Sequence, residues 1–210
     1  MTRNEHYLES DFGIPGQSLI QPDKSGSVRI FVAFPLSPET RSPFRLMAEN
    51  TPPLAGLKWT PQDNLHLTLF FIGETPAENF PEIKFRLSGF FESIQPFQLS
   101  FDRVLLTGKI SRSRMIWARF HHSDSFSSLH NLIHENVKPF MHHPPEFPDP
   151  VPHITIARLK KGVDESAIRL NFPEEFVLPP ITCAEIWQTM REEKGVYYAR
   201  TAHFEFGNNL

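Results

Sequence analysis

Two short stretches decide the fold that the sequence predicts: HLTL at residues 66–69 and HITI at residues 153–156. In each stretch a His and a Thr alternate with aliphatic residues. Because residues two apart on a β-strand point to the same side, each stretch predicts a strand with an imidazole and a hydroxyl on one face. A polar pair on an otherwise apolar strand needs hydrogen-bond partners, which indicates that this face lines a water-filled cleft.

The sequence around the two motifs repeats in the same order. The motifs are 87 positions apart, and each is followed by a predicted hairpin whose return strand carries an aromatic residue, Ala and Arg, at 117–119 and at 198–200. This echo predicts two similar lobes, each giving one His-x-Thr strand to a shared cleft. Predicted helices start after Ser37 and after Thr75, and another covers residues 125–137. Pro43 predicts that the first of these helices is broken or starts late.

Length and composition describe an ordinary globular chain. With 210 residues, 40% of them hydrophobic, the sequence suits one large domain or two small lobes. We expect a polar leader at residues 1–27, extended or mobile, followed by a single domain at residues 28–210. The leader lacks a secretory pattern, and no apolar run approaches the roughly 20 residues that span a bilayer. We therefore expect a cytoplasmic protein with no membrane contact.

The charged and metal-binding residue types narrow the function. A net charge of −3 argues against an extended basic nucleic-acid surface but allows a compact phosphate-bearing ligand. Cys183, the single cysteine, excludes an internal disulfide and a Cys-rich zinc site, and its apolar surroundings predict an inert thiol. His130 and His134 have metal-ligand spacing, but HNLIH lacks the Glu of the zinc-protease motif, so we interpret them as a solvated helix face. No metal or other cofactor is predicted.

Two histidines, each beside a hydroxyl, suit cleavage of a phosphodiester. A neutral imidazole can take a proton from the nucleophile while an imidazolium gives one to the leaving oxygen. The two Thr hydroxyls can donate to the non-bridging oxygens, where charge builds in the transition state. Side chains then handle both proton transfers.

HLTL and HITI, with RIFVAFPLS at 29–37, SRSRMIWARF at 111–120 and PHITIARL at 152–159, resemble the 2H phosphoesterase superfamily, in its RNA 2′,3′-cyclic phosphodiesterase branch, also called 2′-5′ RNA ligases. The resemblance covers roughly residues 28–206. It implies an α+β, bilobal fold: two pseudo-symmetric lobes, each with an antiparallel sheet facing a central cleft, and helices outside. It also implies metal-independent hydrolysis of RNA 2′,3′-cyclic phosphate ends to 2′-phosphates, with 2′-5′ ligation as the reverse reaction.

The resemblance extends to individual residues. It implies catalytic His66 and His153, phosphate-binding Thr68, Thr155 and Arg158, and nucleobase-stacking Phe71. It further implies that the first His is the general acid at the 3′ oxygen and the second is the base that activates water.

The predicted partners are RNA ends or nucleotides bearing a 2′,3′-cyclic phosphate, bound by a monomer. Lys109, Arg112 and Arg114, on the predicted hairpin loop, are candidate contacts to a longer RNA, with a solvated basic turn as the alternative. Three other functions stay open: a 2H enzyme acting on ADP-ribose cyclic phosphates, one acting on 2′-5′ oligoadenylates, or a nucleotide- or RNA-binding module without turnover. Intact copies of both motifs argue against the last.

Overall fold

The computed structural model describes residues 20–108, 114–143, 150–168, 170, 172–173, 175–192 and 195–207. Its strands are β1 (Ser27–Pro35), β2 (Leu57–Trp59), β3 (His66–Pro76), β4 (Phe101–Thr107), β5 (Arg114–Phe120), β6 (His153–Leu159), β7 (Cys183–Glu192) and β8 (Gly195–Glu205). Its α-helices are α1 (Pro38–Asn50), α2 (Phe80–Phe91) and α3 (Asp124–Val137).

The strands pair in the order β4-β5-β6-β3-β1-β7-β8, with β2 also on β6, and every pairing is antiparallel. The predicted α+β class with antiparallel strands is confirmed. The strands do not separate into two sheets, because one register pair between β3 and β6, Leu67 opposite Ile154, joins them into a single hydrogen-bonded path. The two motif strands therefore meet at the centre of the molecule.

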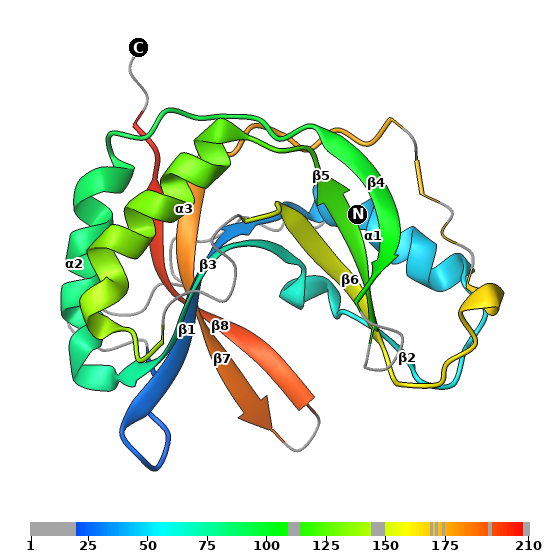
Figure 1. The fold of residues 1–210 in the computed structure, drawn as a ribbon, viewed down its shortest axis with the longest axis horizontal. Helices are drawn as coiled ribbons and strands as arrows, with labels where there is room; N and C mark the ends of the chain where they lie inside the picture. Colours follow the sequence, from blue (N-terminus) through cyan, green and yellow to red (C-terminus); the bar gives the residue numbers. More distant parts are fainter. Residues whose placement is uncertain are drawn as a thin grey trace, which may run out of the picture.

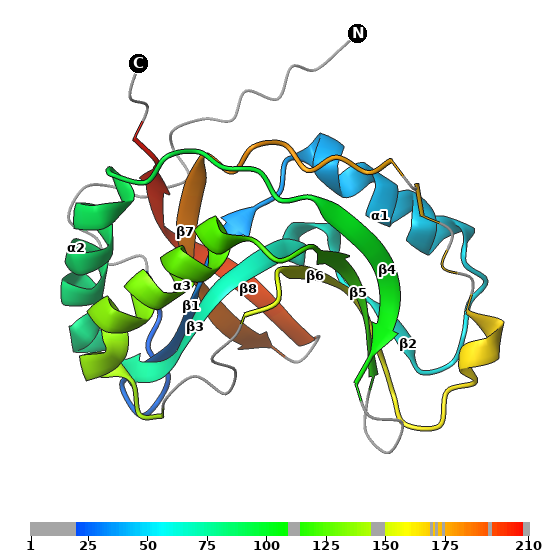
Figure 2. The ribbon, with the colours of Figure 1, turned by 45° about the horizontal axis from the view of Figure 1, so that its top comes forward.

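Helices cover the sheet at both ends. In Figures 1 and 2, α2 and α3 lie side by side at one end, and α1 lies at the other, beyond β4–β6. α3 contacts β3, and α2 contacts β8. The many phenylalanines fill the core beneath these helices, since Phe44, Phe70, Phe91 and Phe126 are all at most 2% exposed.

Two local expectations are wrong. α1 runs unbroken from Pro38 to Asn50, because the Ser37 hydroxyl caps it before Pro43, and buried Phe44 and Met47 anchor it to the core after Pro43. His130 does not lie on a solvated face: it is only 7% exposed and packs on the ring of Phe70, 4.8 Å between centroids.

The part of the leader that the structure describes is attached to the domain. Ile20 is buried, and the Gln21 amide N–H donates to the side-chain oxygen of Gln188 on β7 at 2.9 Å. The Gln188 amide nitrogen donates back to the Gln21 carbonyl at 2.6 Å. Residues 1–19 lie outside the described residues. In the part of the chain that the structure describes, no helix is long and apolar enough to cross a membrane.

The central join makes a stability prediction. Leu67 is 0% exposed, so Leu67→Ala removes buried methyl groups beside the β3–β6 pair and lowers the free energy of unfolding by about 2–5 kcal/mol. Leu46→Ala on α1, where the side chain is 47% exposed, is the matched control and changes it by less than about 1 kcal/mol. Urea denaturation measures both, and equal losses would contradict the burial argument.

Candidate active site

The two motif histidines are held in the same way. His66 Nδ1 lies 2.7 Å from the Asn64 carbonyl, and His153 Nδ1 lies 2.8 Å from the Val151 carbonyl, in each case two residues before the imidazole. A carbonyl oxygen only accepts, so both Nδ1 atoms carry the hydrogen. In each neutral ring the unprotonated nitrogen is therefore Nε2. The Thr68 hydroxyl donates to this atom of His66 at 3.0 Å.

Both motif strands carry a β-bulge at the same place. On β3 the extra residue is Leu69, three positions after the histidine, and on β6 it is Ile156, again three positions after. In each strand the bulged residue and the residue after it are both buried. The alternation between the two faces then continues, shifted by one residue. The residue five after each histidine, Phe71 or Arg158, returns to the histidine face and is exposed.

The β3–β6 join brings the predicted residues together. Antiparallel register around Leu67 and Ile154 sets His66 across from Thr155, and sets Thr68 across from His153, on the face opposite those two aliphatic side chains. The charges of His153 and Arg158 both lower the pKa of His66, in agreement with their place on the same face.

Aromatic rings enclose His66. Its imidazole lies 5.0 Å from the rings of Phe31 and Trp187 and 5.1 Å from that of Tyr198, measured between centroids. Burial among these rings lowers the pKa of His66 to about 4, partly opposed by its hydrogen bond to Asn64. Near pH 7 the free protein therefore holds this imidazole neutral.

His153 has a different aromatic neighbour. The indole of Trp117 on β5 stacks on the His153 ring at 3.6 Å and 18°. Burial, with the charge of Arg158, lowers the pKa of His153 as well. The aromatic residue that follows each motif packs on the histidine of the other motif. Trp117, after the first motif, packs on His153, and Tyr198, after the second motif, packs on His66.

A buried carboxylate supports the rings beneath His66. Glu185 is 2% exposed and accepts a hydrogen bond from the Trp187 indole nitrogen at 2.6 Å. His203 and Arg200 also lie against this carboxylate, and the Arg200 guanidinium lies 5.3 Å from the centre of the Trp187 ring. No sequence motif indicated Glu185 or His203, although the aromatic-Ala-Arg echo contained Trp117, Tyr198 and Arg200.

Of the three cations predicted on the basic loop, the structure describes only Arg114. Lys109 and Arg112 lie outside the described residues. Arg114 forms an ion pair with Glu165, so its charge is already neutralised.

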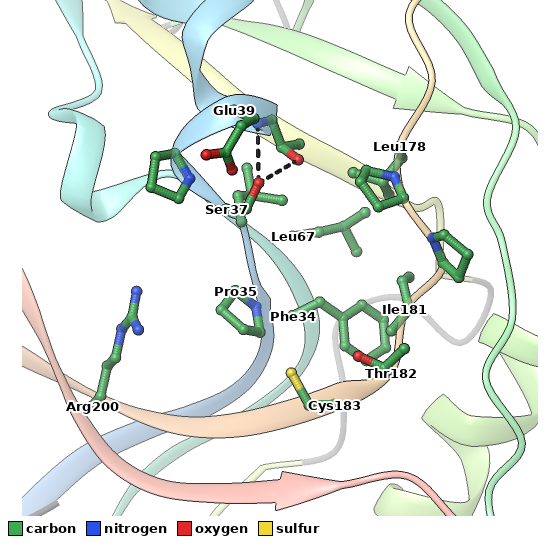
Figure 3. A pocket seen from close by; sticks show the side chains of 15 residues that line it. Phe34, Pro35, Ser37, Glu39, Leu67, Leu178, Ile181, Thr182, Cys183 and Arg200 are labelled. Atoms are coloured by element: carbon green, nitrogen blue, oxygen red, sulfur yellow. Dashed lines mark hydrogen bonds between the residues drawn. The ribbon is translucent and has the colours of Figure 1, made fainter. Parts of the chain in front are cut away.

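A separate cavity of about 430 Å³ lies at the end of β1 (Figure 3). Leu67, Cys183 and Arg200 line it, as does the Ser37 cap of α1. Leu67 faces away from His66, so this cavity is distinct from the histidine face. Burial and the nearby Glu185 raise the pKa of the Cys183 thiol to about 12, in agreement with an inert cysteine.

Both sequence and structure comparisons show similarity to phosphoesterases of the predicted family. The model of the family "LigT like Phosphoesterase" matches residues 34–117. An RNA 2′,3′-cyclic phosphodiesterase of Archaeoglobus fulgidus is 27% identical over 180 residues, which are 85% of this chain and 100% of that protein. A second, from Thermotoga maritima, is 28% identical over 130 residues, 61% of this chain and 66% of its own length.

Solved structures share the fold. Escherichia coli LigT in its apo form matches with a TM-score of 0.69 and 20% identity, over 87% of this chain and 99% of that one. The protein TT0787 of Thermus thermophilus matches with a TM-score of 0.70 and 23% identity, over 87% and 100%. The chain is similar to the LigT-like phosphoesterases, and its match to the family model covers residues 34–117. The predicted family resemblance is thereby confirmed, and the antiparallel α+β arrangement is the LigT-like fold.

The protonation states of His66 and His203 are directly testable. In an NMR titration of the imidazole resonances, His66 should reach half-protonation at a pH of about 4, because burial disfavours its charged form. His203 is the internal control: carboxylates of Glu185 and Glu205 raise its pKa to about 8. A His66 midpoint near the ordinary value of about 6.5 would contradict the role given to the aromatic enclosure.

Proposed function

We propose that this chain hydrolyses RNA 2′,3′-cyclic phosphate ends to 2′-phosphates, with His66 and His153 as its acid–base pair. The observation that carries the proposal is the matched tautomer: both imidazoles present Nε2 on the face that holds Thr68 and Thr155. The substrate class is supported by the name of the A. fulgidus relative, an RNA 2′,3′-cyclic phosphodiesterase aligned over its whole length.

The proposed chemistry is an in-line displacement at phosphorus. One imidazole removes a proton from water, whose oxygen attacks phosphorus and forms the new P–O bond. The bond from phosphorus to the 3′ oxygen breaks, and the imidazolium on the opposite side protonates that oxygen. The products are a 3′-hydroxyl and a 2′-phosphate. A ribose 5′-hydroxyl in place of water would give a 2′-5′ linkage by the same steps.

Three side chains suit the developing negative charge. The hydroxyls of Thr68 and Thr155 lie on the histidine face and can donate to the non-bridging oxygens. Arg158 reaches the same face because of its bulge, and its guanidinium adds a charge-assisted contact. Phe71, 59% exposed on that face, offers a flat ring on which the terminal base stacks.

The acid must gain its proton when substrate binds. We assign His66 as the acid at the 3′ oxygen and His153 as the base, following the family resemblance. With a pKa of about 4, His66 is neutral in the free protein near pH 7. A phosphate anion placed against Nε2 favours the charged form of His66 and raises its pKa. Substrate binding would therefore favour protonation of His66, which it needs in order to act as the acid.

Removing either histidine tests the proposal. His66→Ala and His153→Ala should each lower turnover of a short RNA 2′,3′-cyclic phosphate by at least 10²–10⁴-fold, since each removes one proton transfer. The assay contains EDTA and identifies the product. His122→Ala is the matched control, because that imidazole is exposed and pairs with Asp124. Full activity in either site variant would exclude the pair, and exclusive turnover of ADP-ribose cyclic phosphate or 2′-5′ oligoadenylate would change the substrate class.

The leaving group separates the two roles. A substrate whose 3′ leaving group is far more acidic than ribose hardly needs an acid, so it should restore turnover to His66→Ala but not to His153→Ala. Single-turnover rates with both substrates measure this rescue. Rescue of His153→Ala alone would reverse the roles, and a 3′-phosphate product would contradict the in-line geometry.

A further inference from the structure

A second cation lies beside Arg158 on the histidine face. Strand β2 pairs antiparallel with β6, and its central residue, Lys58, is directly opposite Arg158 in register. Residues directly opposite in an antiparallel pair point to the same side of the sheet. Since the bulge at Ile156 brings Arg158 to the histidine face, Lys58 faces the site as well, one strand further out, about 5 Å away in the hydrogen-bonding direction.

The Lys58 side chain extends across the site rather than away from it. Its ammonium nitrogen lies 3.3 Å from the position that a Cβ at Gly195 would occupy, at the start of β8. β2 and β8 lie on opposite sides of the β3–β6 join in the strand order. The Lys58 side chain therefore reaches from β2 to the start of β8. Among the residues that the structure describes, Lys58 has no ion pair, and its side chain is exposed.

Lys58 and Phe71 flank the histidines at opposite ends. β3 runs from His66 towards Phe71, and antiparallel β6 runs the other way, from His153 towards Arg158. A ribose 2′,3′-cyclic phosphate also has two groups that diverge from the reacting phosphorus, the base at C1′ and the chain at C5′. With the base on Phe71, the C5′ substituent points towards the Lys58 end.

We propose that Lys58 binds the first internucleotide phosphate of the substrate and so makes the site selective for RNA chain ends over mononucleotides. This inference rests on the proposed function. Hydrogen bonding between an ammonium and a phosphate oxygen is charge-assisted, and at an open site it weakens as salt rises. The internucleotide phosphate is the group that a mononucleotide 2′,3′-cyclic phosphate lacks.

The test compares two substrates, a dinucleotide with a 2′,3′-cyclic phosphate end and the corresponding mononucleotide 2′,3′-cyclic phosphate. Lys58→Met keeps the unbranched stem and removes the charge. It should lower the ratio of kcat/KM, dinucleotide over mononucleotide, on the order of tenfold at low salt. Lys58→Arg should largely preserve this ratio. Lys161→Ala, an exposed lysine just beyond β6, removes the same charge elsewhere and should leave the ratio unchanged.

The salt dependence supplies a second readout. For the dinucleotide, the slope of log kcat/KM against log salt should be shallower in Lys58→Met by about 0.7, the contribution of one neutralised phosphate on a single strand. Arg158→Met is the comparison for the reacting phosphate and should lower kcat/KM for both substrates.

The outcomes distinguish the two proposals. If the unmodified protein turns over neither substrate, the proposed function fails. If it turns over both and Lys58→Met leaves their ratio unchanged, the inference about Lys58 is overturned. An equal loss for both substrates in Lys58→Met would also overturn it, since the ammonium would then act at the reacting phosphate.

Discussion

One backbone register, Leu67 opposite Ile154, is the constraint on which the candidate site depends. Both side chains are 0% exposed, so the apolar core fixes the pairing, and the polar side chains on the other face have no freedom to slide. A one-residue slip would turn the imidazoles into the core and the aliphatic residues into water. The same burial that stabilises the fold thus sets the distance between the two halves of the site.

The two histidines share a tautomer but not an environment. Carbonyls of Asn64 and Val151 fix both Nδ1 hydrogens, whereas the His66 ring is enclosed by three aromatic rings and the His153 ring is stacked flat on Trp117. Enclosure removes water from the first imidazole and favours its neutral form. Under the proposed function, an anionic substrate placed against the enclosed ring favours its charged form, so the two histidines can take different roles in one displacement.

Few cations serve the site, in keeping with a net charge of −3. Arg158 and Lys58 lie opposite one another on β6 and β2, while Arg114 and Arg119 form ion pairs with carboxylates. A protein of this charge does not hold nucleic acid by a broad basic surface. Under the proposed function, recognition depends on a small number of contacts around one terminal nucleotide.

The sequence by itself determined the local pattern: alternation in HLTL and HITI places each His and Thr on one face of a strand. Strict alternation would also send Phe71 and Arg158 to the core. The bulges at Leu69 and Ile156 bring both side chains back to the histidine face. Each bulge arises from a register shift in the pairing with a neighbouring strand, β1 or β5. The aromatic partners likewise depended on the tertiary structure, since Trp117 and Tyr198 each pack on the histidine of the other half. Within one regular stretch, the side that a residue takes follows from its near neighbours in the chain. Which strand lies alongside, and where a bulge shifts the alternation, follows from long-range pairing that no local pattern encodes.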